Sequence, residues 1–156
     1  MNRLNIFCSI VVLFSFFQFG CGNDNSAAPL PTGTITGEIT FVGTLKPDGD
    51  IKVQLWRNWP PSGDPFLSID FGNASGKQAY SFENLPLATY QAVTVDWLVP
   101  DNPSQNRIIG VYWANSDSVG TAGTIQSTQQ PSTIILSANN IMQENIDIKA
   151  DHGLVN

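Results

Sequence analysis

The residues that could perform nucleophilic or zinc chemistry are few in this chain of 156 residues. Its only cysteines are Cys8 and Cys21, and His152, near the C-terminus, is its only histidine. A Ser-His-Asp or Cys-His arrangement needs a histidine beside its nucleophile, and a zinc site usually combines several His and Cys ligands. A lone histidine near a chain end is typical of a solvated residue. We therefore expect no catalytic residue, no metal site and no cofactor, and we expect that the protein is not an enzyme.

Carboxylates are more numerous, with thirteen Asp and Glu residues in the chain. Asp48 and Asp50 share one predicted turn, and Asp64, Asp101 and Asp117 fall in other loops. Calcium takes about six to eight oxygen ligands, which loops at one end of a β-domain could supply. Aspartate is also an ordinary turn residue, and we favour that interpretation. Among thirteen acids a close pair is inevitable, so the count does not indicate a glycosidase.

Tryptophan is the more informative residue type, because this chain has four of them. By alternation Trp56 falls on the polar face of its predicted strand, and Trp59 lies in a proline-rich loop. Exposed aromatic rings stack on sugar rings or pack against a protein partner. Trp56 and Trp59 are therefore the candidate ligand-binding residues. In the alternative interpretation Trp97 and Trp113 fill the core and Trp59 packs under its own loop.

The N-terminal segment has the pattern of a targeting signal. Arg3 supplies a positive charge, and residues 6–17 (IFCSIVVLFSFF) form an almost wholly apolar run. A helix that spans a bilayer needs about 20 apolar residues, whereas the apolar region of a signal peptide has about 7 to 15. The pattern predicts a signal peptide over residues 1–20 rather than a retained membrane anchor.

The pair Gly20-Cys21 directly after this run resembles the lipobox of bacterial lipoproteins. In that family the cysteine receives a diacylglyceryl group and becomes the new N-terminus. Gly20 matches the small residue of the motif, while Gln18 and Phe19 differ from its usual aliphatic and small residues. The resemblance implies that Cys21 is lipidated and holds the protein on a membrane. By resemblance to enterobacterial sorting, Gly22 after the cysteine, in place of Asp, permits onward transport to the outer membrane or the cell surface in a Gram-negative cell. The alternative is a plain secretory signal with an accidental cysteine.

Residues 21–32 are predicted to be a flexible linker, because the stretch after the cysteine (GNDNSAAPLP) is polar and offers little to bury. Removal of residues 1–20 would leave six basic residues against thirteen acidic ones. A nucleic acid would be repelled by that charge, and so would an anionic membrane surface. Cys21 would be the only remaining thiol, which excludes an internal disulfide. Membrane attachment would therefore depend on the lipid.

From residue 33 onward apolar residues recur at every second position. In residues 34–41 (TITGEITF), Ile35, Gly37, Ile39 and Phe41 share one face of the predicted strand. Further strands are expected at residues 51–56, 67–71, 80–82, 88–98, 107–113, 133–136 and 145–150. The pattern predicts an all-β fold, a single antiparallel β-sandwich of seven or eight strands over residues 33–150, followed by a tail over residues 151–156.

Three segments resemble the transthyretin-like, carboxypeptidase-regulatory-like β-sandwich family. They are residues 33–40 (GTITGEIT), 51–55 (IKVQL) and 80–90 (YSFENLPLATY), although Ala88 stands where the family prefers glycine. The resemblance covers residues 33–148 and implies this sandwich, but the fold serves spacers, enzyme accessories and ligand-binding modules alike. Tyr90 is expected to place its ring in the core and its hydroxyl on a backbone group of the preceding corner.

The leading hypothesis for function is a non-enzymatic, lipid-anchored envelope protein that binds or scaffolds a partner. The alternative is a carbohydrate-binding module of a cell-surface glycan-utilisation system, which would depend on Trp56 and Trp59. The expected partners are a membrane, through the lipid on Cys21, and a protein or a glycan, but no nucleic acid.

Overall fold

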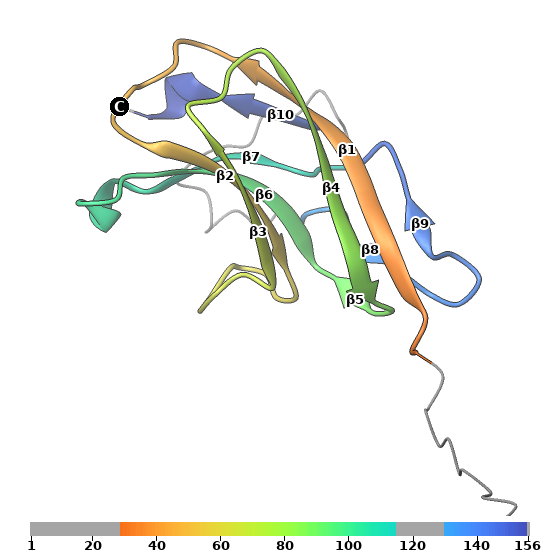
Figure 1. Ribbon diagram of the computed structural model, residues 1–156. Helices are drawn as coiled ribbons and strands as arrows, with labels where there is room; N and C mark the ends of the chain where they lie inside the picture. The colour runs from red at the N-terminus through yellow and green to blue at the C-terminus, as the bar shows by residue number, and fades with distance from the viewer. Residues whose placement is uncertain (1–28, 115–129, 156) are drawn as a thin grey trace, which may run out of the picture.

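The computed structural model describes residues 29–114 and 130–155, and this part of the chain is all-β (Figure 1). It has ten strands and two short 3-10 helices. In chain order they are β1 (Thr32–Val42), β2 (Asp50–Trp56), β3 (Leu67–Gly72), β4 (Lys77–Pro86), β5 (Thr89–Tyr90), β6 (Ala92–Leu98), η1 (Pro103–Gln105), β7 (Arg107–Val111), β8 (Ile134–Ile135), β9 (Met142–Gln143), β10 (Ile148–Asp151) and η2 (His152–Leu154). The predicted all-β class is confirmed. The two strands beyond the expected eight are β5 and β9, which have only two residues each.

Two four-stranded sheets and one two-stranded sheet form a β-sandwich-like arrangement (Figure 1). The first sheet has the order β10-β1-β4, with β9 also paired to β1. The second sheet has the order β3-β2-β6-β7, and β5 pairs with β8 in the small sheet. One hydrophobic core contains buried side chains of both larger sheets, among them Ile35, Ile39, Phe82 and Ile148 from the first and Val53, Leu55, Val95 and Ile109 from the second.

The period-two pattern of β1 explains how the first sheet contributes to this core. Ile35 and Ile39 are fully buried and Phe41 nearly so, whereas Thr36 and Thr40 are only partly covered. Complete burial of such a side chain stabilises the fold by about 1.5–3 kcal/mol. The burial of every second, apolar side chain of β1 therefore stabilises the sheet in which β1 lies between β4 and β10.

Two pairings are parallel, whereas we expected an antiparallel arrangement throughout. Ile39 of β1 pairs with Ile148 of β10, and Thr34 of β1 with Met142 of β9, both in parallel. After β8 the chain reverses at Ser137 to Asn140, close to the start of β1, and then follows β1 in the same direction. Apolar alternation indicates which face of a strand is buried but not the direction of its neighbour, so the expectation was wrong on this point.

The long strand expected over residues 88–98 is divided into β5 and β6. The chain passes from the small sheet to the second large sheet at Gln91, whose backbone N–H donates to the carbonyl of Trp56 at 2.8 Å. Tyr90 is fully buried, and its hydroxyl donates to the carbonyl oxygen of Pro86 at 2.9 Å. The predicted contact of Tyr90 with the corner is confirmed.

The segment expected to be a tail from residue 151 packs on the domain instead. β10 includes Asp151, whose carboxylate accepts the N–H of Gly153 at 2.7 Å and so begins η2. Val155 is 4% exposed and belongs to the hydrophobic core. A short turn that buries one apolar residue has no periodicity, and so the sequence pattern did not reveal it. The described domain extends from Thr32 to Val155.

Candidate functional site

Cys21, the predicted lipidation site, lies outside the described residues. The first described strand, β1, begins at Thr32, eleven residues further along the chain. Among the residues described, no helix has the length and apolarity that crossing a bilayer requires. The predicted linker therefore ends where the folded domain begins.

Trp56 lies at the end of β2 on the face turned away from the core, as its position in the alternation predicted. It is nevertheless only 6% exposed. Its indole Nε1 donates a hydrogen bond of 2.9 Å to the hydroxyl of Thr94, and that hydroxyl donates to a carboxylate oxygen of Asp96. Trp56 is therefore part of a closed polar cluster and offers no open ring face in this structure.

Asp96 is the ionisable member of this cluster and was not singled out from the sequence. It is 6% exposed, and burial raises its pKa from 3.8 to about 7, although the hydrogen bond from Thr94 acts in the opposite direction. The sequence signal was an acid in the middle of an otherwise β-branched and aromatic strand. Perturbed carboxylates occur at functional sites and in structural networks alike. Because Thr94 is fully buried and Trp56 nearly so, we assign this cluster a structural role.

Trp59 lies in the loop between β2 and β3 and is half-buried. Its ring packs edge-on against Trp113, with 6.3 Å between the ring centroids. The amide of Asn58 closes this loop by donating to the carbonyl and hydroxyl of Ser62 at 3.2 and 2.6 Å. Trp97 is in the core, as the alternative interpretation predicted, whereas Trp113 is buried outside the core cluster and contacts Trp59. The carbohydrate hypothesis remains a prediction, and it now depends on Trp59.

Gly37 of β1 adjoins a polar hollow at the surface of the described domain. Gly37 lies opposite Tyr80 of β4, and the Tyr80 hydroxyl reaches across it to donate to the carbonyl oxygen of Ile146 at 2.5 Å. A Cβ atom at Gly37 would overlap that carbonyl group. Asn145 before it has a φ of 60°, in the left-handed region. The segment between β9 and β10 therefore bends over the edge of β1 only because residue 37 has no side chain.

The hollow beside this bend has a volume of about 720 Å³. Its lining residues come from β1, β4 and the segment before β10 and are Thr36, Gly37, Glu38, Ala79, Tyr80, Ser81, Glu144, Asn145 and Asp147. The lining includes three carboxylates, two hydroxyl groups of Thr and Ser, one Tyr hydroxyl and one amide. Such a lining offers mainly hydrogen-bond acceptors, which suit a cationic or a hydroxyl-rich ligand.

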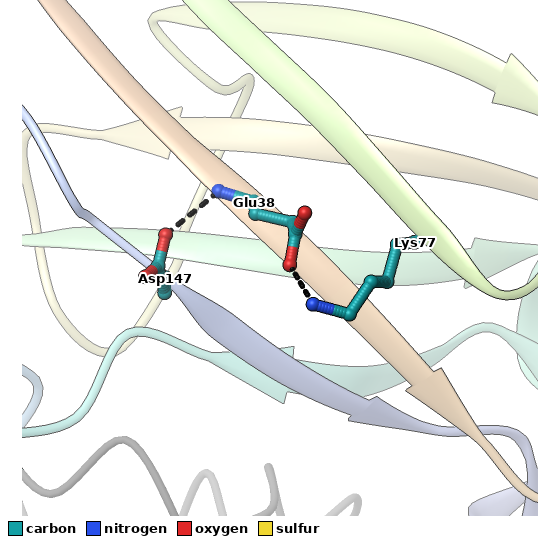
Figure 2. Close-up of polar contacts among 3 residues, drawn as sticks. All are labelled: Glu38, Lys77 and Asp147. Carbon is teal, nitrogen blue, oxygen red and sulfur yellow. Dashed lines mark hydrogen bonds and ion pairs between the residues drawn. The ribbon is translucent and has the colours of Figure 1, made fainter.

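Hydrogen bonds fix two of the three carboxylates, as Figure 2 shows. Asp147 accepts the backbone N–H of Glu38 at 2.8 Å, which continues the pairing of β1 where the regular ladder is interrupted. The ammonium group of Lys77 lies 2.5 Å from a carboxylate oxygen of Glu38. The hydrogen bond and the charge of Glu38 raise the pKa of Lys77, and burial raises the pKa of Tyr80. The sequence showed Glu38 only as a polar-face residue, because the partners come from distant segments.

The loop aspartates do not assemble into an ion site in the part of the chain that the structure describes. Within residues 29–114 and 130–155, no group of three or more His, Cys, Asp or Glu side chains is arranged to hold a metal ion. Asp48, Asp64 and Asp101 are exposed in three different loops, and Asp117 lies outside the described residues. This placement agrees with their interpretation as turn residues.

His152 is 1% exposed, and so the expectation of a solvated histidine was wrong. Its ring stacks on Phe41 with 5.1 Å between the centroids and 15° between the planes. Burial lowers its pKa, although the backbone of Ala74 and the charge of Asp151 oppose that shift. Neither ring nitrogen has a well-aligned hydrogen bond within the described residues. The histidine thus acts as a flat apolar group where β10 turns into η2.

Comparison with known proteins identifies none that is similar to this chain. No family model, no curated protein and no solved structure matches the sequence or the fold.

Proposed function

We propose that this chain is a lipid-anchored protein of the bacterial cell envelope, and that its β-domain binds or scaffolds a partner rather than catalysing a reaction. The observation that carries the proposal is the position of Cys21. It follows an apolar run of signal-peptide length, and it precedes the first strand of the domain by eleven residues. A cysteine at this junction can hold the whole folded domain outside the cytoplasm through a lipid.

We propose further that the domain is a transthyretin-like sandwich. Two observations support this assignment. Residues 80–90 carry the family pattern, and Tyr90 makes the corner contact with Pro86 that the pattern implies.

The hollow over β1 and β4 supports binding as the mode of action. Its carboxylates and hydroxyls lie at an open surface, and its lining holds no histidine or cysteine that could serve as a base or a nucleophile. A ligand or partner with cationic or hydroxyl groups would match this lining best. The glycan alternative has the same hydroxyl-rich chemistry, with Trp59 as its remaining aromatic residue.

The lipid anchor is tested by labelling growing cells with an alkyne analogue of palmitate. The wild-type chain is expected to carry the label and to sediment with the membranes, because the acyl chains on Cys21 hold it there. Cys21→Ser should lose at least nine-tenths of the label and pass into the soluble extracytoplasmic fraction. Cys8→Ser is the matched control, since Cys8 lies inside the predicted signal peptide and should leave labelling unchanged. Equal labelling of wild type and Cys21→Ser would refute the anchor.

A further inference from the structure

The large hydrophobic side chains that remain exposed lie at one end of the described domain. They are Leu30 (85% exposed), Leu67 (40%), Ile135 (56%), Ile141 (50%) and Met142 (55%). Isolated exposed hydrophobic residues are common on protein surfaces, but their gathering at one end marks an interaction surface.

Strand pairing, chain position and Figure 1 together place the five at the end where β1 begins. Met142 pairs with Thr34, and the carbonyl of Ile141 accepts the N–H of Thr34 at 2.8 Å. The carbonyl of Ile135 accepts the side-chain amide of Gln143, the neighbour of Met142, at 3.3 Å. Leu30 precedes β1 by two residues. Leu67, on the second sheet, begins β3 beside Leu55, and Figure 1 shows that β3 begins at the same end.

Three of these residues form what we call the anchor-end patch, namely Ile135, Ile141 and Met142. β8 and β9 have only two residues each, so each buries little beyond the backbone it pairs with. Ile134 and Leu136, on either side of Ile135, are buried in the core, which turns Ile135 outward. Local structure therefore fixes Ile135 in an exposed position, and Ile141 and Met142 are half exposed where the chain pairs with β1.

The chain reaches this same end from its proposed lipid anchor. Thr32 lies eleven positions after Cys21, and a fully extended chain over that distance spans at most about 40 Å. The anchor would therefore keep the patch within about 40 Å of the bilayer. An apolar contact that is too weak to recruit a free protein becomes effective at such a high local concentration.

We propose that the anchor-end patch rests on the lipid surface and inserts its side chains among the headgroups. The inference rests on the proposed lipid anchor at Cys21. Lipid is the occupant that the geometry favours, since the patch adjoins the point where the chain arrives from the membrane. The chain carries a net charge of −6, so attraction to anionic lipid cannot drive the contact. Burial of Ile and Met side chains at the boundary between headgroups and acyl chains supplies the free energy instead.

A fluorescent probe at Met142 tests the contact in the full-length, lipidated protein. Cys8 is predicted to leave with the signal peptide and Cys21 to be acylated, so Met142→Cys would carry the only free thiol. The labelled protein is reconstituted into phosphatidylcholine vesicles that contain lipids with a doxyl quencher on the acyl chain. We expect the Met142→Cys probe to be quenched at least twofold more strongly than a probe at Asp101→Cys. Asp101 is exposed in the loop before η1, at the opposite end of the domain.

The outcomes separate this proposal from the anchor on which it depends. Protein that floats with the vesicles but shows equal, weak quenching at both positions refutes the docking and leaves the anchor intact. Protein that does not float refutes the anchor and the docking together. A Met142→Cys probe that is shielded in native membranes but unquenched in pure lipid would identify a protein as the occupant and would overturn the lipid assignment. Ile135→Ser with Ile141→Ser, added to the labelled variant, should reduce the quenching without releasing the protein.

Discussion

Asp96 combines a position on the outward face of β6 with nearly complete burial. A carboxyl group in that position is easier to bury as the neutral acid, and its pKa therefore rises to about 7. The proton is held more tightly in the folded state than in the unfolded chain, where the pKa is 3.8. The contribution of Asp96 to the free energy of unfolding should therefore be most favourable below the lower value and fall as the pH rises between these two values.

Asp96→Asn is predicted to remove this pH dependence. The amide keeps the shape of the acid and its contact with Thr94 but cannot ionise. Each pKa unit corresponds to about 1.4 kcal/mol. The variant should therefore exceed the wild type in free energy of unfolding by up to a few kcal/mol near pH 8, and should match it near pH 4. Urea denaturation followed at a series of pH values measures the difference.

Asp101→Asn is the matched control, because Asp101 is exposed. It should keep the wild-type profile. Parallel pH profiles of wild type and Asp96→Asn would show that Asp96 does not control this part of the stability.

At the scale of elements, Gly37 decides how β1 is shared among its partners. The Ile146 carbonyl occupies the space that a side chain at residue 37 would need, and the Tyr80 ring lies close beside it. This crossing lets the chain leave β9, bend past β1 and return to it as β10.

Gly37→Ala is predicted to destabilise the domain by about 2–4 kcal/mol, because the added methyl group must displace backbone rather than a mobile side chain. Thermal unfolding measures the loss. Ser81→Ala, at an exposed position of the neighbouring strand, should change the free energy of unfolding by less than about 0.5 kcal/mol. Equal stability of Gly37→Ala and wild type would mean that the bend over β1 is not part of the folded protein.

The strands were predictable where apolar residues alternate over several positions, as in β1 and β2. The pattern failed where a strand is short or changes partner. β9 has two residues, and the stretch of residues 88–98 reads as one strand although it serves two sheets. Direction is the other unpredictable quantity, since β10 would show the same alternation beside β1 whether parallel or antiparallel.

At the scale of the whole molecule, the exposed hydrophobic residues and the core residues differ in how much they contribute to the stability of the fold. Ile141 is 50% exposed and Met142 is 55% exposed, so the burial of these two side chains contributes little to the stability of the fold. Ile148, six residues further along, is 2% exposed and belongs to the core.

Ile141→Ser with Met142→Ser is therefore predicted to leave the free energy of unfolding within about 1 kcal/mol of the wild type. Ile148→Ser should cost roughly 3 kcal/mol or more, because it places a hydroxyl in the core and leaves a cavity. Urea denaturation of the Cys21→Ser form of each variant makes the comparison in solution. A large loss in the double variant would assign these two residues to folding and would contradict their role as a contact surface.

The candidate site was less predictable than the fold, because its parts come together from distant segments. Trp56 was correctly placed on the outward face, but its burial depends on the structure around it and not on its strand. Glu38, Lys77 and Asp147 meet only when β1, β4 and the segment before β10 pair. His152 could not be distinguished from a solvated residue, since a single turn carries no periodic signal.

The packed C-terminal turn gives the domain a direction. Val42, at the end of β1, pairs with Asp151, and His152 stacks on Phe41. Residues 151–155 therefore lie at the end of the domain opposite the start of β1. If the segment before β1 were tethered to lipid, residues 151–155 would lie farther from the bilayer by the length of β1, about 35 Å. A reporter protein joined after Val155 would lie at the opposite end of the domain from the start of β1 and would leave the N-terminal segment unchanged.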